Sequence, residues 1–444
     1  MKNITSYLLL TLFICSFTAA SLSAQTSEFV DKYNKKFLTK DPKIGAELKE
    51  VSVFDEQGKP LKLSNTRGKY SVLIFGCLTW APYLKNISGT ETVFTDYNKN
   101  VNFYYVYSNI QHPETNGFVA PYSIKEKLMH VAEVKRRTGS KIPWICDTMD
   151  NQLKATLEAG PNAEFVIDPR GVIVKKRYWS DPTTLRADLA ELIGAIENPT
   201  KLEDLKTRFK VEARKVASGV VSRMKLPGGL KPIETHPQLK KDGPPFFAKL
   251  RAEADAGLLK DGKGKLYLSL NIDPLHKVHW NNKMGSVSIM LDDAESIAFG
   301  KQKLVAPKVE TPIDIDPREF LVDVEMKKSD TPIELTVEYT VCDDAETFCL
   351  PVQQQYILKV KKDKYGGTRP GIFLVGLFAD VNKFDKNGDG ILTKDELPEG
   401  KVSLYVGHMD KNENGQIDPE EISEFNKMFE NGKGFGRAKN DGAK

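Results

Sequence analysis

The 444-residue sequence predicts a multidomain chain in which an α/β domain is followed by a β-sandwich domain and a small α-helical domain. Strand-like and helix-like patterns alternate through the first 200 residues, which is typical of α/β folds. Short β-rich runs separated by turn signals follow between residues 264 and 363, as in a β-sandwich. Two acidic loops of twelve residues lie close to the end of the sequence and predict a helical, cation-binding unit.

The composition is that of an ordinary globular protein, with 40% hydrophobic and 28% charged residues. The formal net charge is only +4, and no Lys/Arg cluster is interleaved with aromatic residues. We therefore expect no nucleic-acid partner.

Residues 1–24 have the pattern of a secretory signal peptide. Lys2 gives a positive start, residues 7–20 are apolar, and small residues follow up to Ala24. The apolar run is shorter than the about 20 residues of a membrane span. The sequence thus predicts an exported protein, periplasmic or extracellular, with no membrane span after signal removal and with access to disulfide chemistry.

The α/β domain is predicted to cover residues 27–200. Its expected elements, in order, are a hairpin at 51–63, a strand at 71–75, a helix through 91–98, a strand at 101–108, a helix capped by the box Ser123–Glu126, a short helix at 151–159, strands at 165–167 and 172–178, and a helix from Pro182 to Ile193 that Asp181 caps. This β-α-β, then β-β-α order is the thioredoxin arrangement.

Several short motifs add a family resemblance. Residues 68–76 (GKYSVLIFG) resemble the redoxin superfamily. Residues 147–151 (DTMDN), Pro161 and the pair His112–Pro113 resemble the iodothyronine-deiodinase branch. The resemblance covers about residues 43–193, and it implies a thioredoxin-like fold with a cysteine or selenocysteine nucleophile placed after a Thr and before Pro-Pro-Phe.

In this chain the nucleophile position holds Trp80, and Tyr83 occupies the place of a resolving residue. The acidic residues that precede the family's His are replaced by Asn109 and Ile110. Because an indole cannot attack a disulfide, an iodine or a peroxide, we expect a vacated site whose aromatic pair could bind a ligand instead. Cys77 follows the buried strand and is a candidate reactive thiol, with a packed apolar role as the alternative.

Residues 201–261 are predicted to form a helix and then a linker, because an apolar stripe runs through 201–224 and Pro and Gly are frequent at 226–245. Residues 262–363 are predicted to form the β-sandwich. Its expected strands lie at 266–272, 287–291, 320–326, 333–341 and 355–360.

The segment 342–351 (CDDAETFCLP) resembles the cysteine hairpin in the immunoglobulin-like amino-terminal domain of the bacterial thiol–disulfide transporter DsbD, through Cys342, Cys349, Phe348 and Pro351. The resemblance implies an immunoglobulin-like fold and a redox-active pair that exchanges electrons with a partner protein. The alternative is a disulfide that only staples the hairpin.

The two acidic loops match the EF-hand motif within residues 370–430. Carboxylate, amide and carbonyl oxygens at fixed loop positions form the shell of six to eight oxygens that Ca²⁺ prefers. The predicted ligands are Asp385, Asn387, Asp389, Ile391, Thr393 and Glu396 in the first loop, and Asp410, Asn412, Asn414, Gln416, Asp418 and Glu421 in the second. The sequence therefore predicts two Ca²⁺ sites.

Leu392 and Ile417 both occupy position 8 of their loops, so we expect a short β-bridge between them. Thr393 and Glu396 form a capping box. Only residues 397–409 separate the loops, which leaves little room for the long helices of calcium sensors. We expect structural calcium with an affinity of about 0.1–1 mM, and a disordered tail at 431–444.

Three functions remain open from the sequence. The chain could be an exported calcium-binding protein whose thioredoxin-like domain is a scaffold or binding module in a thiol–disulfide context. It could be a thiol–disulfide oxidoreductase that works through Cys342 and Cys349. A deiodinase-like reductase is the third.

Overall fold

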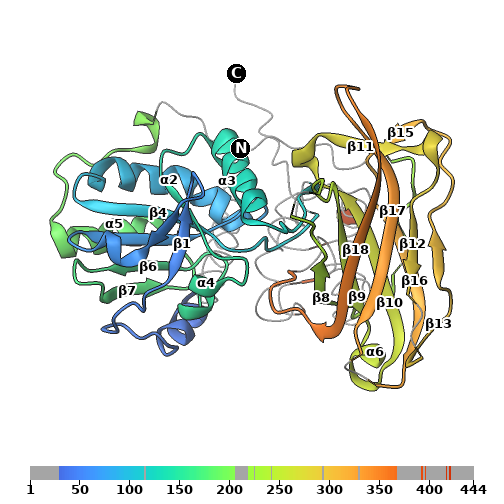
Figure 1. Cartoon of the computed structure of the whole chain (residues 1–444). Helices are drawn as coiled ribbons and strands as arrows, with labels where there is room; N and C mark the ends of the chain where they lie inside the picture. Colours follow the sequence, from blue (N-terminus) through green and yellow to red (C-terminus); the bar gives the residue numbers. More distant parts are fainter. Residues whose placement is uncertain are drawn as a thin grey trace, which may run out of the picture.

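The computed structural model describes residues 30–114, 117–205, 219–224, 226–241, 243–292, 295–328 and 331–367, together with residues 392, 393, 396, 417, 420 and 421. Within these ranges the chain forms an α/β body up to residue 205 and a β body from residue 219, which lie side by side in Figure 1. The expected signal peptide, the tail at 431–444 and residues 206–218 of the expected helix lie outside the described residues. No helix among the described residues is long and apolar enough to cross a membrane.

The α/β body is built on a seven-stranded sheet with the order β2-β1-β5-β4-β3-β6-β7. Its strands are β1 (Ser52–Asp55), β2 (Pro60–Lys62), β3 (Tyr70–Phe75), β4 (Val101–Tyr107), β5 (Trp144–Cys146), β6 (Glu164–Ile167) and β7 (Ile173–Arg177). Strands β3, β4 and β5 are parallel. Strands β6 and β7 extend the sheet antiparallel beyond β3, and the β1–β2 hairpin extends it beyond β5.

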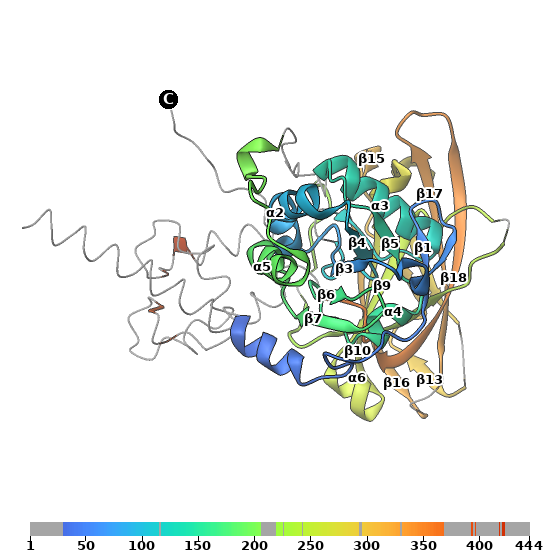
Figure 2. The ribbon, with the colours of Figure 1, turned by 90° about the vertical axis from the view of Figure 1, so that its left-hand side faces the viewer.

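Helices cover both faces of this sheet. Helices α2 (Ala81–Tyr97), α3 (Ile124–Thr138) and α5 (Pro182–Ile193) bury their apolar side chains on one face, against residues such as Ile74 and Trp144. Right-handed crossovers from β3 to β4 and from β4 to β5 place α2 and α3 on that same face. A helix at 30–38 and α4 (Gln152–Thr156) cover the other face. Figure 2 shows the α/β body in front of the strands of the β body.

This arrangement is the thioredoxin-like one that the sequence predicts. Both predicted helix caps are present, because Ser123 Oγ accepts the Glu126 N–H at 3.2 Å and Asp181 Oδ1 accepts the Thr184 N–H at 2.7 Å. Strand β5 was not among the predicted strands. It is three residues long, too short to give a periodic signal.

The β body contains eleven antiparallel strands and a short helix, α6 (Ala256–Asp261). The strands are β8 (Lys231–Pro237), β9 (Ala248–Ala254), β10 (Lys263–Ile272), β11 (Val278–Asn281), β12 (Ser288–Leu291), β13 (Ile297–Phe299), β14 (Lys303–Val305), β15 (Ile313–Asp314), β16 (Arg318–Met326), β17 (Ile333–Asp343) and β18 (Cys349–Lys362).

Strand β8 joins the two halves of this body. One half runs β13-β16-β10-β9-β8 and the other runs β8-β18-β17-β11-β15, with β12 and β14 beside β17. Both halves contribute buried side chains to a single core, such as Leu268 from β10 and Val337 from β17. All five predicted strands are present, while the immunoglobulin-like assignment stays a prediction.

The predicted linker requires a correction. Residues 231–261 belong to the β body, because β8 pairs with both β9 and β18 and α6 packs its Leu258 into the core. The Pro-rich composition that indicated a linker includes Pro232 and Pro237 at either end of β8. Proline is tolerated near strand ends, where fewer ladder hydrogen bonds are required.

Candidate functional site

The position that the family resemblance assigns to a nucleophile lies at the start of α2, in the segment after strand β3. Trp80 is the residue before the first turn of α2, and Pro82 lies within that turn. Its indole stacks on His112 with ring centroids 5.3 Å apart and on Trp179 with centroids 5.7 Å apart. The position therefore holds an aromatic stack, in which Trp80 contacts rings from two distant segments.

Tyr83 is not available for binding, contrary to the expectation that the Trp80–Tyr83 pair could hold a ligand. Its side chain is 1% exposed and packs edge-on against Tyr105 and Trp144. Gly76 accommodates the ring, since a Cβ at that position would lie 2.4 Å from Tyr83. Tyr83 is thus part of the core of the α/β body.

The two thiols of the α/β body are also buried. Cys77 is 1% exposed, and its Sγ lies 3.5 Å from the hydroxyl of Thr79. Cys146 is fully buried, and burial raises its pKa to about 12. Both are free cysteines, so they form no disulfide with each other. A protonated, enclosed thiol is a poor nucleophile.

The β body covers the edge of the sheet where the parallel strands end. In open α/β sheets this carboxyl edge is where ligands bind. Here the loop after β4 contacts residues 363–367: Asn109 Nδ2 donates to the Tyr365 carbonyl at 3.2 Å. Gly367 lies so close that a Cβ there would be 2.5 Å from the Gln111 carbonyl oxygen.

A buried polar cluster holds the two bodies together. From the α/β body, the Tyr122 hydroxyl donates to the Leu250 carbonyl and accepts the Leu250 N–H, both at 3.0 Å. The Lys249 ammonium lies 2.5 Å from Glu126 and 3.9 Å from Asp273. Glu126, Asp273 and His276 place ligand atoms within 4.8 Å of one another, as in a metal site. Because Lys249 already supplies a cation there, we describe the cluster as an ion-pair network.

The protonation of this cluster follows from its contacts. Burial alone would raise the pKa of Glu126, but the neighbouring His276 ring, 3.7 Å away, and the Lys249 ammonium lower it to about 2. Next to it, burial lowers the pKa of His130 to about 4, and its Nδ1 pairs with the Tyr107 hydroxyl at 2.5 Å. Neutral His130 and charged Glu126 are therefore the forms present near neutral pH.

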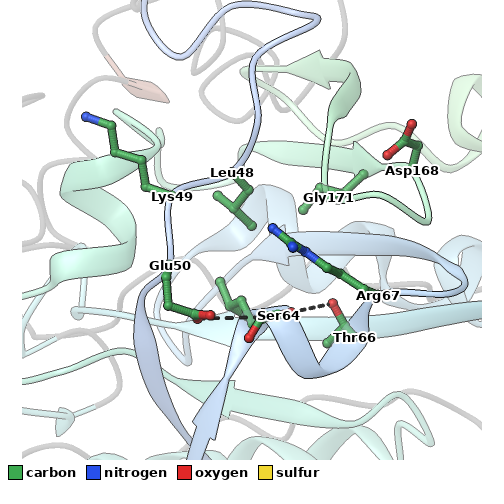
Figure 3. A pocket seen from close by; sticks show the side chains of 10 residues that line it. Leu48, Lys49, Glu50, Ser64, Thr66, Arg67, Asp168 and Gly171 are labelled. Atoms are coloured by element: carbon green, nitrogen blue, oxygen red, sulfur yellow. Dashed lines mark hydrogen bonds between the residues drawn. The ribbon is translucent and has the colours of Figure 1, made fainter.

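Two cavities lie among the described residues. A cleft of about 350 Å³ lies between the two bodies, and its apolar lining includes Ile110, Val119, Tyr122, Ile233, Leu250 and Tyr365. A second pocket in the α/β body has a volume of only about 20 Å³, beside Glu50, Ser64 and Arg67 (Figure 3). That volume accommodates about one water molecule.

The disulfide lies at the end of the β17–β18 hairpin. Cys342 and Cys349 are bonded and face each other in register across the two strands. Cys342 is 4% exposed, whereas Cys349 is exposed to solvent. Asn281 Nδ2 lies 3.2 Å from the sulfur of Cys342 and 3.7 Å from that of Cys349.

Most predicted calcium ligands lie outside the described residues: Asp385, Asn387, Asp389, Ile391, Asp410, Asn412, Asn414, Gln416 and Asp418. The described positions agree with paired loops. Leu392 and Ile417 form the predicted bridge, with reciprocal N–H to carbonyl bonds of 2.9 and 3.0 Å. Glu396 and Glu421, the last residues of the two loops, are both buried. Glu396 accepts the Thr393 N–H at 2.9 Å, as the capping box predicts.

Three features of the site were not predicted from sequence. Trp179 lies 99 positions from Trp80, and the Lys249–Glu126 pair joins residues 123 positions apart, so no local pattern reveals either contact. Asn281 is the last residue of the four-residue strand β11 and carries no motif of its own.

The EF hand family model matches residues 379–399 and 409–426. No curated protein matches the chain. Among solved structures, a thiol:disulfide interchange protein from Bacteroides sp. is 17% identical, covering 35% of this chain and 93% of that one with a TM-score of 0.28. The thioredoxin domain of a thiol-disulfide oxidoreductase from Bacteroides vulgatus is 19% identical, covering 33% and 95% with a TM-score of 0.26.

The exposed lipoprotein thioredoxin of Streptococcus pneumoniae strain TIGR4 is 17% identical, covering 32% of this chain and 99% of that one with a TM-score of 0.26. We draw no function from likenesses this distant. The strand order and the family match together give the result: the chain carries a thioredoxin-like domain and an EF-hand region at 379–426.

Proposed function

We propose that this chain is an exported calcium-binding protein whose thioredoxin-like domain is a scaffold or binding module rather than a thiol catalyst. The observation that carries the scaffold role is the stack of Trp80 between His112 and Trp179 at the nucleophile position. The burial of Cys77 and Cys146 supports it, since neither thiol reaches solvent. The signal-like residues 1–24 support export.

The position of the β body also supports a scaffold role. Residues 363–367 contact the loop after β4 at the carboxyl edge of the sheet, where a ligand of an open α/β sheet would bind. Because the β body covers the carboxyl edge of the α/β sheet, this edge is suited to holding the β body in place rather than to binding a substrate. Because Trp80 offers no sulfur or selenium, we do not propose deiodinase-like reduction.

Calcium titration of the full chain by calorimetry tests the calcium-binding proposal. We expect two sites with dissociation constants of about 0.1–1 mM. Glu421→Gln removes a predicted bidentate ligand and should weaken its site about tenfold or more. Glu420→Gln is the matched control: it makes the same charge change one residue away, on an exposed side chain. Equal effects of the two variants, or no heat of binding at millimolar calcium, would overturn the proposal.

A second candidate function is thiol–disulfide exchange through Cys342 and Cys349. The solvent exposure of Cys349 favours it, because exchange requires an accessible cysteine. A stapling role would contribute little more than about 2.5 kcal/mol, since a loop this short loses little entropy on closure. The hairpin is in addition closed by its own ladder and by Asp343, which accepts the N–H groups of Thr347 and Phe348.

Thiol mapping by mass spectrometry, before and after mild reduction, separates these two roles. An exchange site should open at a mild potential while the protein stays folded. A disulfide that resists reduction until the chain unfolds would instead support the staple. Reduction of insulin by the wild type but not by Cys342→Ser would then establish enzymatic exchange.

A further inference from the structure

Asn281 lies against the disulfide from the neighbouring strand β11. Its Nδ2 is 3.2 Å from the Cys342 sulfur and 3.7 Å from the Cys349 sulfur, so one amide group faces both sulfurs. The register explains this placement. His279 is paired with Cys342 across β11 and β17, and Asn281 is two residues further along the same face of β11.

A hydrogen bond to the oxygen of the Asn281 side chain fixes the orientation of this amide. Asn281 Oδ1 accepts the N–H of Lys283 at 3.1 Å, because Asn281 also caps the short turn at Asn282–Met284. With the oxygen bound to a backbone donor, the NH₂ group is the end that faces the sulfurs. An N–H donor bonds more strongly to a thiolate than to a neutral sulfur, because hydrogen bonds to charged groups are the stronger ones.

We propose that Asn281 is a catalytic residue for exchange at the Cys342–Cys349 disulfide, where it stabilises the Cys342 thiolate as leaving group. This proposal rests on the second candidate function above. In the reaction, the thiolate of a protein dithiol attacks the sulfur of the exposed Cys349 and forms a mixed disulfide. The Cys342–Cys349 bond breaks, and its electron pair leaves on Cys342 beside the Asn281 amide.

The second thiol of the partner then attacks the partner's own sulfur in the mixed disulfide and releases Cys349. The partner is oxidised to a disulfide, and Cys342 and Cys349 are reduced to two thiols with the two protons of the dithiol. The ladder pair Val341–Leu350 and the Asp343 contacts hold the hairpin closed independently of the disulfide. The Cys342 sulfur is therefore expected to stay next to Asn281 after the bond breaks.

Two matched substitutions separate this role from the capping role. Asn281→Ser keeps an oxygen that can cap the turn and removes the amide donor. Asn281→Asp keeps the cap and the shape but places an anion against the sulfurs. The test uses a Cys349→Ser background, in which the thiolate absorbance of Cys342 near 240 nm is followed as the pH is raised. The same titration of the Cys342→Ser/Cys349→Ser variant gives the background signal from Cys77 and Cys146, which is subtracted.

We expect the Cys342 titration midpoint to rise by about one pH unit in Asn281→Ser, and further in Asn281→Asp. With both cysteines present, equilibration against glutathione buffers should show Asn281→Ser shifted about tenfold towards the disulfide, or about 30 mV. Unchanged midpoints in both variants would overturn the role of Asn281, because a pure cap tolerates Ser and Asp. If the midpoints shift but the wild-type pair never exchanges with a dithiol protein, the proposed exchange function is wrong. The effect of Asn281 on the Cys342 thiolate would then stand without a catalytic role.

Discussion

The two bodies of this protein place their cysteines in different environments. The α/β body encloses Cys77 and Cys146 in its core and holds the stacked indole of Trp80 at the predicted nucleophile position. The β body places a disulfide at the end of a hairpin, with one of its two cysteines exposed and an amide donor beside it. The comparison teaches that a thioredoxin-like fold is not by itself evidence of thiol chemistry: among the described cysteines, the exposed one, Cys349, lies in the other body.

The largest expected effect is a difference in alkylation rate between these cysteines. After mild reduction of the folded protein, Cys349 should react with iodoacetamide on the order of 1000-fold faster than Cys77 or Cys146, because a buried thiol reacts only after local opening. Mass spectrometry of the labelled peptides over time measures all three rates in one sample. A Cys77 rate close to that of Cys349 would break the comparison.

The contact between the bodies gives the next largest effect. Lys249→Met leaves Glu126 and Asp273 buried without their cation, so the free energy of unfolding should fall by about 3–5 kcal/mol. Lys263→Met is the control, since Lys263 pairs with Glu325 on the exposed surface of the same body and should cost less than about 1 kcal/mol. Urea unfolding compares the two variants. Similar losses would mean that the polar cluster does not hold the bodies together.

The free energy of unfolding should depend on pH because of His130, which lies next to this cluster. His130 titrates at about 4 in the folded protein and near 6.5 when unfolded, so the unfolded chain takes up its proton first as the pH falls. Stability should therefore decline between about pH 6.5 and 4, by about 2–3 kcal/mol for this one group.

Glu126 should extend the acid sensitivity below that range. Its folded pKa of about 2 lies below its ordinary value of 4.5, so its contribution is present above pH 4.5 and is lost as the pH falls towards 2. The slope of unfolding free energy against pH tests both groups. His130→Gln should flatten the slope between pH 6.5 and 4 only, and an unchanged slope in this variant would contradict the assignment.

The smallest effect compares two tyrosines of the same core. The Tyr107 hydroxyl pairs with His130, whereas the Tyr83 hydroxyl is buried with no hydrogen-bond partner among the described residues. Tyr107→Phe should cost about 1–2 kcal/mol, while Tyr83→Phe should be neutral or slightly stabilising. Thermal unfolding of both variants measures the difference. A larger loss in Tyr83→Phe would show that this hydroxyl has a partner after all.

Much of the architecture could be predicted from local patterns. The hairpin at β1–β2, the central strands and both helix caps follow from periodicity and from capping residues such as Ser123 and Asp181. The Leu392–Ile417 bridge was predicted from loop position alone, because EF-hand loops have fixed geometry. Strands β8 and β9 were not predicted, since proline-rich composition was interpreted as a linker.

The site was predictable only in part. The Cys342–Cys349 disulfide follows from a recognised hairpin, while a vacated nucleophile site at Trp80 stays a prediction from the order of residues 79–83. The partners of Trp80, the pairing of Lys249 with Glu126 and the amide of Asn281 depend on which segments fold against each other. Such long-range contacts leave no periodic signal in a single sequence.

The anchored segment 363–367 also limits where calcium can act. Arg251 donates to the Gly366 carbonyl at 2.8 Å, and Asn109 holds Tyr365, so the chain leaves the folded bodies from a fixed point at their boundary. The EF-hand match begins at residue 379, and the eleven residues between can reach at most about 40 Å. A calcium-binding loop at the start of that region would therefore act within this radius of residues 363–367.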